Sequence, residues 1–187
     1  LTNNTDNYKF EFAANSDLGK VRSENQDRCG WFETSKKGSY IIAVADGMGG
    51  SAGGAIAAEI ALDSVKKVFE SPYKDPRKQI LISFDLASKK MIDKADTDNT
   101  LHNMGCTLSL VLYFENQIYS GHVGDSRIYR FRGDVITQLS EDHSLVQEMV
   151  KQGAIKPENA RSHPKNNILL RALTTSPDSK LDIYEPI

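Results

Sequence analysis

The chain has 187 residues, of which 39% are hydrophobic and 26% charged, with a formal net charge of −2 at pH 7. This size predicts one domain over residues 1–187. No basic stripe occurs, and no apolar stretch approaches the roughly 18 residues of a membrane span, which argues against nucleic-acid binding and membrane insertion. Cys29 and Cys106 lack metal-binding or redox spacing, which predicts reduced thiols and a cytoplasmic location.

The first part of the chain predicts strands followed by helices. Alternating aromatic residues predict a half-buried strand at Tyr8 to Asn15, and a polar loop separates it from a second strand at Arg28 to Glu33. An apolar strand begins at Tyr40. Two consecutive amphipathic helices are then predicted at Ala52 to Phe69 and at Arg77 to Ala95, a pattern typical of an antiparallel helix pair lying on a sheet.

The second part of the chain returns to strands. Branched and aromatic residues predict an antiparallel meander of four strands, Thr107 to Phe114, Gln117 to Val123, Ser126 to Phe131 and Val135 to Leu139. Two short helices are predicted next, at Leu145 to Gln152 and Lys156 to Arg161, and Ile168 to Leu173 fits either a strand or a helix. Strands, then helices, then strands predict an α+β fold and not a parallel doubly wound sheet.

The strand from Tyr40 leads into the sequence Asp46-Gly47-Met48-Gly49-Gly50. The apolar run predicts a buried strand that stops at a tight turn, with Asp46 at its tip. Glycines allow the backbone to approach a ligand, so the Asp46 carboxylate and the Gly47 carbonyl could both bind a hard cation. An ordinary turn that Asp46 merely starts explains the stretch about equally well.

Residues 47–52 also match the dinucleotide-binding pattern G-x-G-x-x-A. Asp46 would repel a pyrophosphate there, and a second helix follows where a βαβ unit needs a strand. A dinucleotide-dependent oxidoreductase is therefore the weakest of the hypotheses that we carry.

Two further aspartates fit a cation site. Asp125 follows a predicted strand in the sequence Gly124-Asp125, and Asp27 ends the polar loop. Carboxylates at strand ends suit Mg²⁺ or Mn²⁺, which need few protein ligands and keep several waters. Taken alone, Asp125 is better explained as a hairpin turn residue.

Six short motifs occur in the order that one enzyme family shows. They are Arg22 with Asn25-Gln26-Asp27, Asp46 to Gly50, Met104 to Thr107, Gly121 to Arg127, Glu141 to Val146 and Asn167 to Leu173. With them the chain resembles the bacterial branch of the metal-dependent serine/threonine protein phosphatases, called PPM or type 2C. The resemblance implies an α-β-β-α sandwich of two antiparallel sheets flanked by helices, with a mobile flap at residues 144–168 beside the active site.

The resemblance also implies a mechanism, in which water held between two Mn²⁺ or Mg²⁺ ions attacks the phosphorus of phosphoserine or phosphothreonine. Asp46 would bridge the ions and the Gly47 carbonyl would bind one of them. Asp125 would bind a weaker third ion, and Asp27 would support the ligand waters. Arg22 would hold the substrate phosphate, since a guanidinium grips phosphate bidentately.

One position departs from many relatives. Met48 stands where eukaryotic members carry a histidine proposed as general acid, so the leaving group must take its proton from elsewhere. His163 in the presumed flap is a candidate substitute, although a loop histidine before Pro164 is the simpler interpretation. His122 and His143 are expected to be structural.

Arg127 and Arg171 could touch phosphate, but ion pairs within the sheet are the favoured interpretation. Family members continue past a segment like Leu181 to Glu185 into Ser-Asp-Gly and Asp-Asn motifs that supply two more metal ligands. Neither motif occurs here, so we expect the fold to lack its C-terminal strands and helix, with sheet edges open to pairing with a second copy.

The expected partners are phosphorylated proteins, the substrates of a bacterial serine/threonine kinase. The alternative function is a regulatory or phosphoprotein-binding module that keeps the PPM fold but is catalytically impaired. The missing aspartates are the feature of the sequence that favours this alternative.

Overall fold

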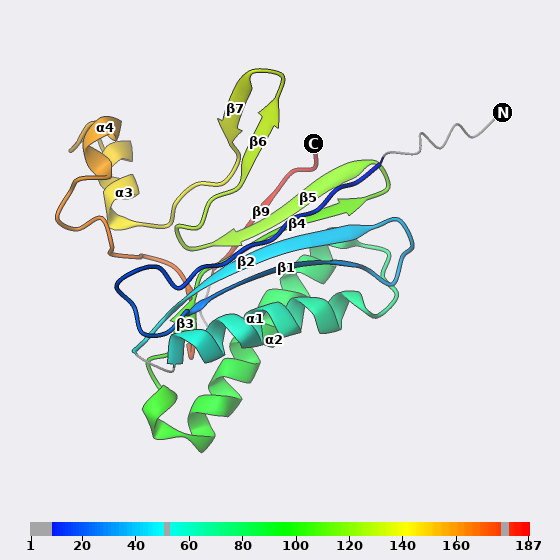
Figure 1. Ribbon diagram of the computed structural model, residues 1–187, viewed down its shortest axis with the longest axis horizontal. Coiled ribbons are helices and arrows are strands. Elements are labelled where there is room, and N and C mark those ends of the chain that lie inside the picture. The colour runs from blue at the N-terminus through cyan, green and yellow to red at the C-terminus, as the bar shows by residue number, and fades with distance from the viewer. Residues whose placement is uncertain (1–8, 51–52, 177–179) are drawn as a thin grey trace.

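The computed structural model describes residues 9–50, 53–176 and 180–187 (Figure 1). They form one main antiparallel sheet, two long helices on one of its faces, and a two-stranded hairpin on the side away from these helices. The predicted α+β class is confirmed. No helix within these ranges has the length and apolar character needed to cross a bilayer.

Seven strands make up the main sheet. In chain order they are β1 (Asp27–Glu33), β2 (Tyr40–Met48), β3 (Gly105–Cys106), β4 (Leu108–Phe114), β5 (Gln117–Val123), β8 (Leu173–Thr174) and β9 (Asp182–Tyr184). The order across the sheet is β8-β3-β2-β4-β5-β9, and β1 pairs separately with β2. All of these pairs are antiparallel, so the described residues contain no βαβ unit of the kind that a dinucleotide fold requires.

Helices α1 (Gly53–Phe69) and α2 (Pro76–Thr97) cover one face of the sheet (Figure 1). The small residues Ala57, Ala58 and Ala61 are fully buried and let α1 lie close to the strands. The α2 helix begins at a strong cap, because the Asp75 carboxylate accepts hydrogen bonds from two backbone N–H groups of the first turn. A short 3-10 helix, η1 (Asn99–Leu101), leads from α2 towards β3.

The β2 strand is buried on one face only. Ile41 and Ala43 face the helices and are 0% and 3% exposed, whereas Ile42 and Val44 on the other face are 41% and 37% exposed. The prediction of a buried strand therefore holds for the helix-covered face alone. Alternation of burial is what an antiparallel sheet covered on one side produces.

Residues 9–18 contain no strand, so the prediction of a strand at Tyr8 to Asn15 is wrong for its described part, and Tyr8 lies outside the described residues. The Phe10 ring packs against Tyr40, and the Phe12 ring stacks on Trp31, with centroid distances of 5.2 and 4.7 Å. The aromatic alternation thus reflects packing across the open face of the sheet and not a hydrogen-bonded ladder. The predicted fraying of Leu1 to Asn7 also falls outside the described residues.

The predicted four-strand meander is wrong, because its strands form two separate hairpins. β4 pairs with β5, while β6 (Tyr129–Arg132) pairs with β7 (Val135–Gln138) in a two-stranded sheet that projects beyond the main one (Figure 1). The chain leaves the main sheet at Gly124, whose φ of +111° is a conformation that favours glycine.

Two short helices follow, α3 (Leu145–Lys151) and α4 (Pro157–Ala160), close to their predicted positions. The segment that carries them closes on itself, because Leu145 N–H donates to the Ile168 carbonyl and Leu170 N–H donates to the His143 carbonyl. An isolated bridge between Ser144 and Leu169 lies between these bonds. We call residues 144–168 the flap; Figure 1 shows it to one side of the main sheet.

Candidate active site

A cavity of about 800 Å³ lies where the end of β2, the turn after β5 and the chain that follows the flap come together. It contains four of the predicted site residues, Arg22, Asp46, Gly47 and Asp125. The other lining residues are Ser23, Glu24, Gln26, Met48, Gly49, Gly50, Thr107, Asn167, Leu169, Leu170, Arg171, Ala172 and Thr174. Residues from widely separated parts of the sequence therefore share one site.

Asp46 does not lie at the tip of β2, which corrects the prediction from sequence. The strand continues through Gly47 and Met48, which pair with β3. Asp46 lies where β2 changes partner from β4 to β3, and Thr107 binds it there twice. The Asp46 N–H donates to Thr107 Oγ1 at 3.0 Å, and the Thr107 N–H donates to the Asp46 carbonyl at 2.9 Å.

Asp27 lies directly opposite Asp46 in the β1–β2 ladder. The pKa of Asp46 is raised to about 6, by burial first, then by the charge of Asp27, a hydrogen bond with Asp27 and the charge of Asp125, whereas the charge of Arg22 lowers it. Asp27 and Arg22 also line a smaller cavity that shares Asp46 and Gly47 with the larger one. The Asp46 carboxylate is thus close to two other acids and one base.

Gly47 lies too close to its neighbours to carry a side chain. A Cβ atom there would come within 2.1 Å of the Gly54 carbonyl oxygen and 2.7 Å of the Gln26 carbonyl oxygen. The Gly47 N–H donates to that Gln26 oxygen at 3.2 Å. The first turn of α1 therefore packs on the backbone of Gly47 and fixes its carbonyl beside Asp46.

Asp125 follows β5 and is half-buried in the cavity wall. Burial is the main reason that its pKa is raised. The preceding Gly124 is also closely packed, since a Cβ there would lie 2.4 Å from Thr107 Cγ2. His143 binds the Gly124 backbone on both sides, accepting its N–H at Nδ1 (3.1 Å) and donating its own N–H to the carbonyl (2.7 Å).

These donors fit a hard divalent cation. Asp46, Asp125 and the adjacent Gly47 carbonyl are oxygen donors, and the raised pKa values show that carboxylates in this site favour a positive neighbour. Within the part of the chain that the structure describes, no three His, Cys, Asp or Glu side chains lie close enough to form a complete ligand set. Mg²⁺ and Mn²⁺ tolerate such a partial set because they keep several waters.

The other residues considered from the sequence lie apart from the residues that would bind phosphate and metal. His163 accepts the Lys165 N–H at Nδ1 (3.2 Å) within the flap and is not among the residues that line the cavity. Arg127 forms a bidentate ion pair with Asp142, at 2.8 Å from Nε and 2.6 Å from Nη2, which confirms the predicted ion pair. His122 is buried between Ser109 and the Glu141 carbonyl, as expected of a structural histidine.

Arg171 forms the expected ion pair, with Asp182, and it also lines the cavity, where contact with phosphate stays a prediction. Neither Thr107 nor Asp182 was predicted to have a role in the site. Thr107 lies in a family motif, which was a usable signal, and its hydroxyl joins Asp46 to Ser126 Oγ at 2.7 Å. Asp182 lies in the family-like segment Leu181 to Glu185, but nothing in that segment indicates its partners, which are distant in sequence.

Comparison with known sequences identifies one family. Residues 20–172 match the family described as Protein phosphatase 2C. The chain is 34% identical over 174 residues to the serine/threonine phosphatase stp of Listeria innocua, an alignment that covers 90% of this chain and 69% of that protein. It is also 34% identical over 169 residues to the serine/threonine protein phosphatase PstP of Mycobacterium tuberculosis, covering 88% of this chain and 31% of the relative.

Solved structures agree with this result. The serine/threonine phosphatase Stp1 of Staphylococcus aureus superposes with a TM-score of 0.83 at 28% identity, covering 90% of this chain and 68% of the other. The catalytic domain of the phosphatase PstP in complex with two manganese ions superposes with a TM-score of 0.79 at 30% identity, covering 92% and 71% of the two chains.

Proposed function

The chain belongs to the protein phosphatase 2C family, and from this premise we propose how its residues act in removing phosphate from phosphoserine and phosphothreonine. It is a metal-dependent protein serine/threonine phosphatase. The observation that carries the assignment of residues is the convergence of Asp46, Asp125 and Arg22 on one cavity. Carboxylates suit divalent ions and a guanidinium suits a phosphate, so the cavity offers both kinds of site.

The Asp46 carboxylate and the Gly47 carbonyl would hold two divalent ions, Asp125 would hold a third, and Asp27 would orient the ligand waters. When bound, the ions supply an activated water as nucleophile and neutralise charge on the phosphate. We propose Mn²⁺ as an effective ion because the relative PstP was solved with two manganese ions, and we expect Mg²⁺ to substitute.

Arg22 would bind the substrate phosphate. Its side chain is exposed in the cavity, and its charge acts on Asp46, which places the guanidinium within electrostatic reach of that carboxylate. Met48 lines the same cavity and carries no transferable proton, so the departing serine or threonine oxygen would take its proton from water. His163 could donate this proton to the departing oxygen only after a change in the position of the flap.

The substrates would be proteins phosphorylated by a bacterial serine/threonine kinase. The chain that leaves the flap, at Asn167 and Leu169, lines the cavity, so the flap would contact the peptide around the phosphorylated residue. A cytoplasmic location is supported by the free thiols of Cys29 and Cys106. β1 and β9 lie at sheet edges and would be the strands that pair if two copies associate, which light scattering would detect.

The assignment is tested by Mn²⁺-dependent release of phosphate from a phosphothreonine peptide. We expect activity in the unsubstituted protein, its loss on addition of EDTA, and a decrease of about 100-fold or more in Asp46→Asn. Asp93→Asn, which removes an exposed aspartate from α2, is the matched control and should retain activity. Binding of the phosphopeptide without phosphate release would instead support the phosphoprotein-binding alternative.

A further inference from the structure

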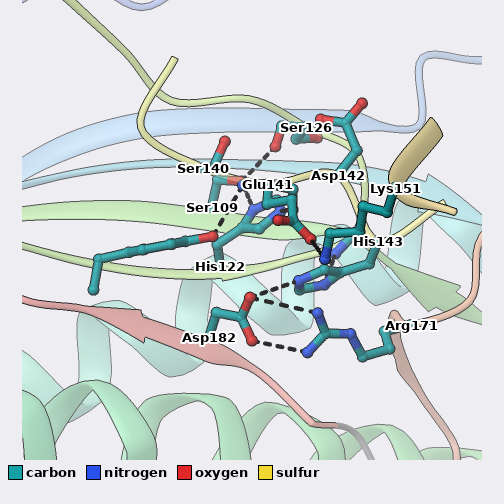
Figure 2. Close-up of polar contacts among 12 residues, drawn as sticks. Ser109, His122, Ser126, Ser140, Glu141, Asp142, His143, Lys151, Arg171 and Asp182 are labelled. Atoms are coloured by element: carbon teal, nitrogen blue, oxygen red, sulfur yellow. Dashed lines mark hydrogen bonds and ion pairs between the residues drawn. The ribbon is translucent and has the colours of Figure 1, made fainter. Parts of the chain in front are cut away.

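Asp182, on β9, binds one residue that precedes the flap and one that follows it (Figure 2). Its Oδ2 accepts a hydrogen bond from His143 Nε2 at 3.0 Å, and its Oδ1 accepts one from Arg171 Nη1 at 2.8 Å. His143 immediately precedes the flap, and Arg171 lies three residues after it. One carboxylate therefore joins the two chain segments at the base of the flap.

Each partner of Asp182 either lines the cavity or binds a residue beside it. Arg171 lines the cavity directly. His143 is connected to the cavity through Gly124. The Nδ1 atom of His143 accepts a hydrogen bond from the Gly124 N–H, and the next residue, Asp125, lines the cavity. Because Nδ1 is an acceptor in this bond, the ring hydrogen of neutral His143 lies on Nε2 and points to Asp182.

The environment makes these contacts strong. The His143 side chain is 1% exposed, and those of Arg171 and Asp182 are each 34% exposed. Burial alone would raise the pKa of Asp182, but hydrogen bonds from Arg171 and His143 outweigh it, so this pKa lies below its usual range. The ionised carboxylate thus makes charge-assisted hydrogen bonds in a partly dry setting.

We propose that Asp182 is a positioning residue for the phosphatase reaction, an inference that rests on the proposed function. Its carboxylate holds Arg171 in the cavity wall and holds His143 against the turn that carries Asp125. It thereby fixes the position of the chain segments at His143 and Arg171, which form the base of the flap, relative to the proposed phosphate site. Residues at the end of the flap and just after it line the cavity, so a phosphorylated peptide would contact them and a small aryl phosphate would not, and the position of Asp182 should matter most for peptide substrates.

Asp182→Asn tests this proposal with little change in size. Asp182 Oδ2 also accepts a hydrogen bond from Arg171 Nη2 at 3.4 Å, so the carboxylate accepts three hydrogen bonds in all. An asparagine is uncharged and has one acceptor oxygen, and its amide N–H group would face a donor of either Arg171 or His143, so at least one of these bonds is lost and the others are weakened. We expect KM for a phosphothreonine peptide to rise about tenfold and KM for p-nitrophenyl phosphate to change less than about twofold. Glu185→Gln is the matched control, because Glu185 directly follows β9 and pairs with Arg77 in an exposed ion pair, and both KM values should stay unchanged.

A second pair of measurements separates positioning from stability. If Asp182 acts through Arg171, the double variant Arg171→Gln/Asp182→Asn should raise peptide KM no more than the larger single effect. Amide hydrogen exchange at Leu145 and Leu170, whose N–H groups close the flap base, should become about tenfold faster in Asp182→Asn but not in Glu185→Gln.

The exchange measurement needs no turnover, so it decides the proposal even if the unsubstituted protein proves inactive, which would count against the proposed function alone. Unchanged exchange at Leu145 and Leu170 would overturn the proposal. So would a loss of kcat for both substrates in proportion to a smaller folded fraction, since that is the result expected of a residue that only stabilises β9.

Discussion

The carboxylates of Asp27 and Asp46 meet across the β1–β2 ladder, where the two residues are direct partners. Like charges opposite each other destabilise an antiparallel pair. Burial, and then the charge of Asp27, accordingly raise the pKa of Asp46 to about 6. The fold therefore carries a local electrostatic cost at neutral pH that a bound cation would remove.

Asp46→Asn should stabilise the metal-free protein at pH 7.5 by about 1 kcal/mol, less than the pKa shift alone implies, because the side chain is only partly buried and solvent screens its charge. The pKa of Asp46 in the folded protein, about 6, exceeds its usual 3.8, so the folded state holds the extra proton between these values. The free energy of unfolding of the unsubstituted protein thus falls as pH rises through this window.

Urea unfolding in EDTA measures this effect. The stabilisation by Asp46→Asn should be largest at pH 7.5 and smaller at pH 5, where most of the Asp46 population is protonated. Asp93→Asn should change the stability little at either pH. A variant that is less stable than the unsubstituted protein at pH 7.5 would show that Asp46 makes favourable contacts that outweigh its repulsion.

Mn²⁺ should raise the melting temperature of the unsubstituted protein, and the rise should be larger at pH 7.5 than at pH 5.5. A carboxylate must lose its proton to bind a metal, and the raised pKa of Asp46 places this step near pH 6. Asp46→Asn should abolish most of the shift, and Asp125→Asn should reduce it less. Equal shifts in the unsubstituted protein and in Asp46→Asn, measured by differential scanning fluorimetry, would place the metal elsewhere.

Thr107→Val should destabilise the protein by about 1–2 kcal/mol, because it removes the hydroxyl that accepts the Asp46 N–H and leaves that donor without its partner. Activity should fall as well, since Asp46 would be held less rigidly. Thr97→Val at the end of α2 is the control: its exposed hydroxyl bonds only to the Lys94 carbonyl in the described structure. If the two variants unfold at the same urea concentration, the Thr107 hydroxyl contributes nothing to the site.

The central part of the fold could be predicted from local patterns. The apolar run before Asp46 predicted a strand, and helical spacing predicted α1 and α2 within a few residues of their observed ends. The glycine cluster predicted an approach of the backbone to a ligand, which stays a prediction; the close approach that the structure shows is that of Gly47 to the first turn of α1. These features depend on residues that are near one another in sequence, so periodicity and residue type suffice to predict them.

Features set by distant partners could not be predicted in this way. β2 continues past Asp46 only because β3, nearly 60 residues later, pairs with Gly47 and Met48. The aromatic alternation at Phe10 and Phe12 suits a strand equally well, and only the packing on Trp31 and Tyr40 separates the two cases. Asp182 binds partners 11 and 39 residues away, and no local pattern indicates such contacts.

Arg22→Lys should weaken substrate binding, because a lysine keeps the charge but cannot bind phosphate bidentately as a guanidinium does. We expect KM for a phosphothreonine peptide to rise about fivefold to tenfold, and inhibition by inorganic phosphate to weaken by a similar factor. The free energy of unfolding should stay within about 0.5 kcal/mol of that of the unsubstituted protein, because Arg22 is exposed. Arg132→Lys on the β6–β7 hairpin is the matched control, since this exposed arginine lies outside the residues that line the cavity. Steady-state kinetics with both variants tests this prediction. If inorganic phosphate inhibits Arg22→Lys as strongly as it inhibits the control, a group other than Arg22 holds the phosphate. Arg171, the other arginine in the cavity wall, is then the residue to substitute next.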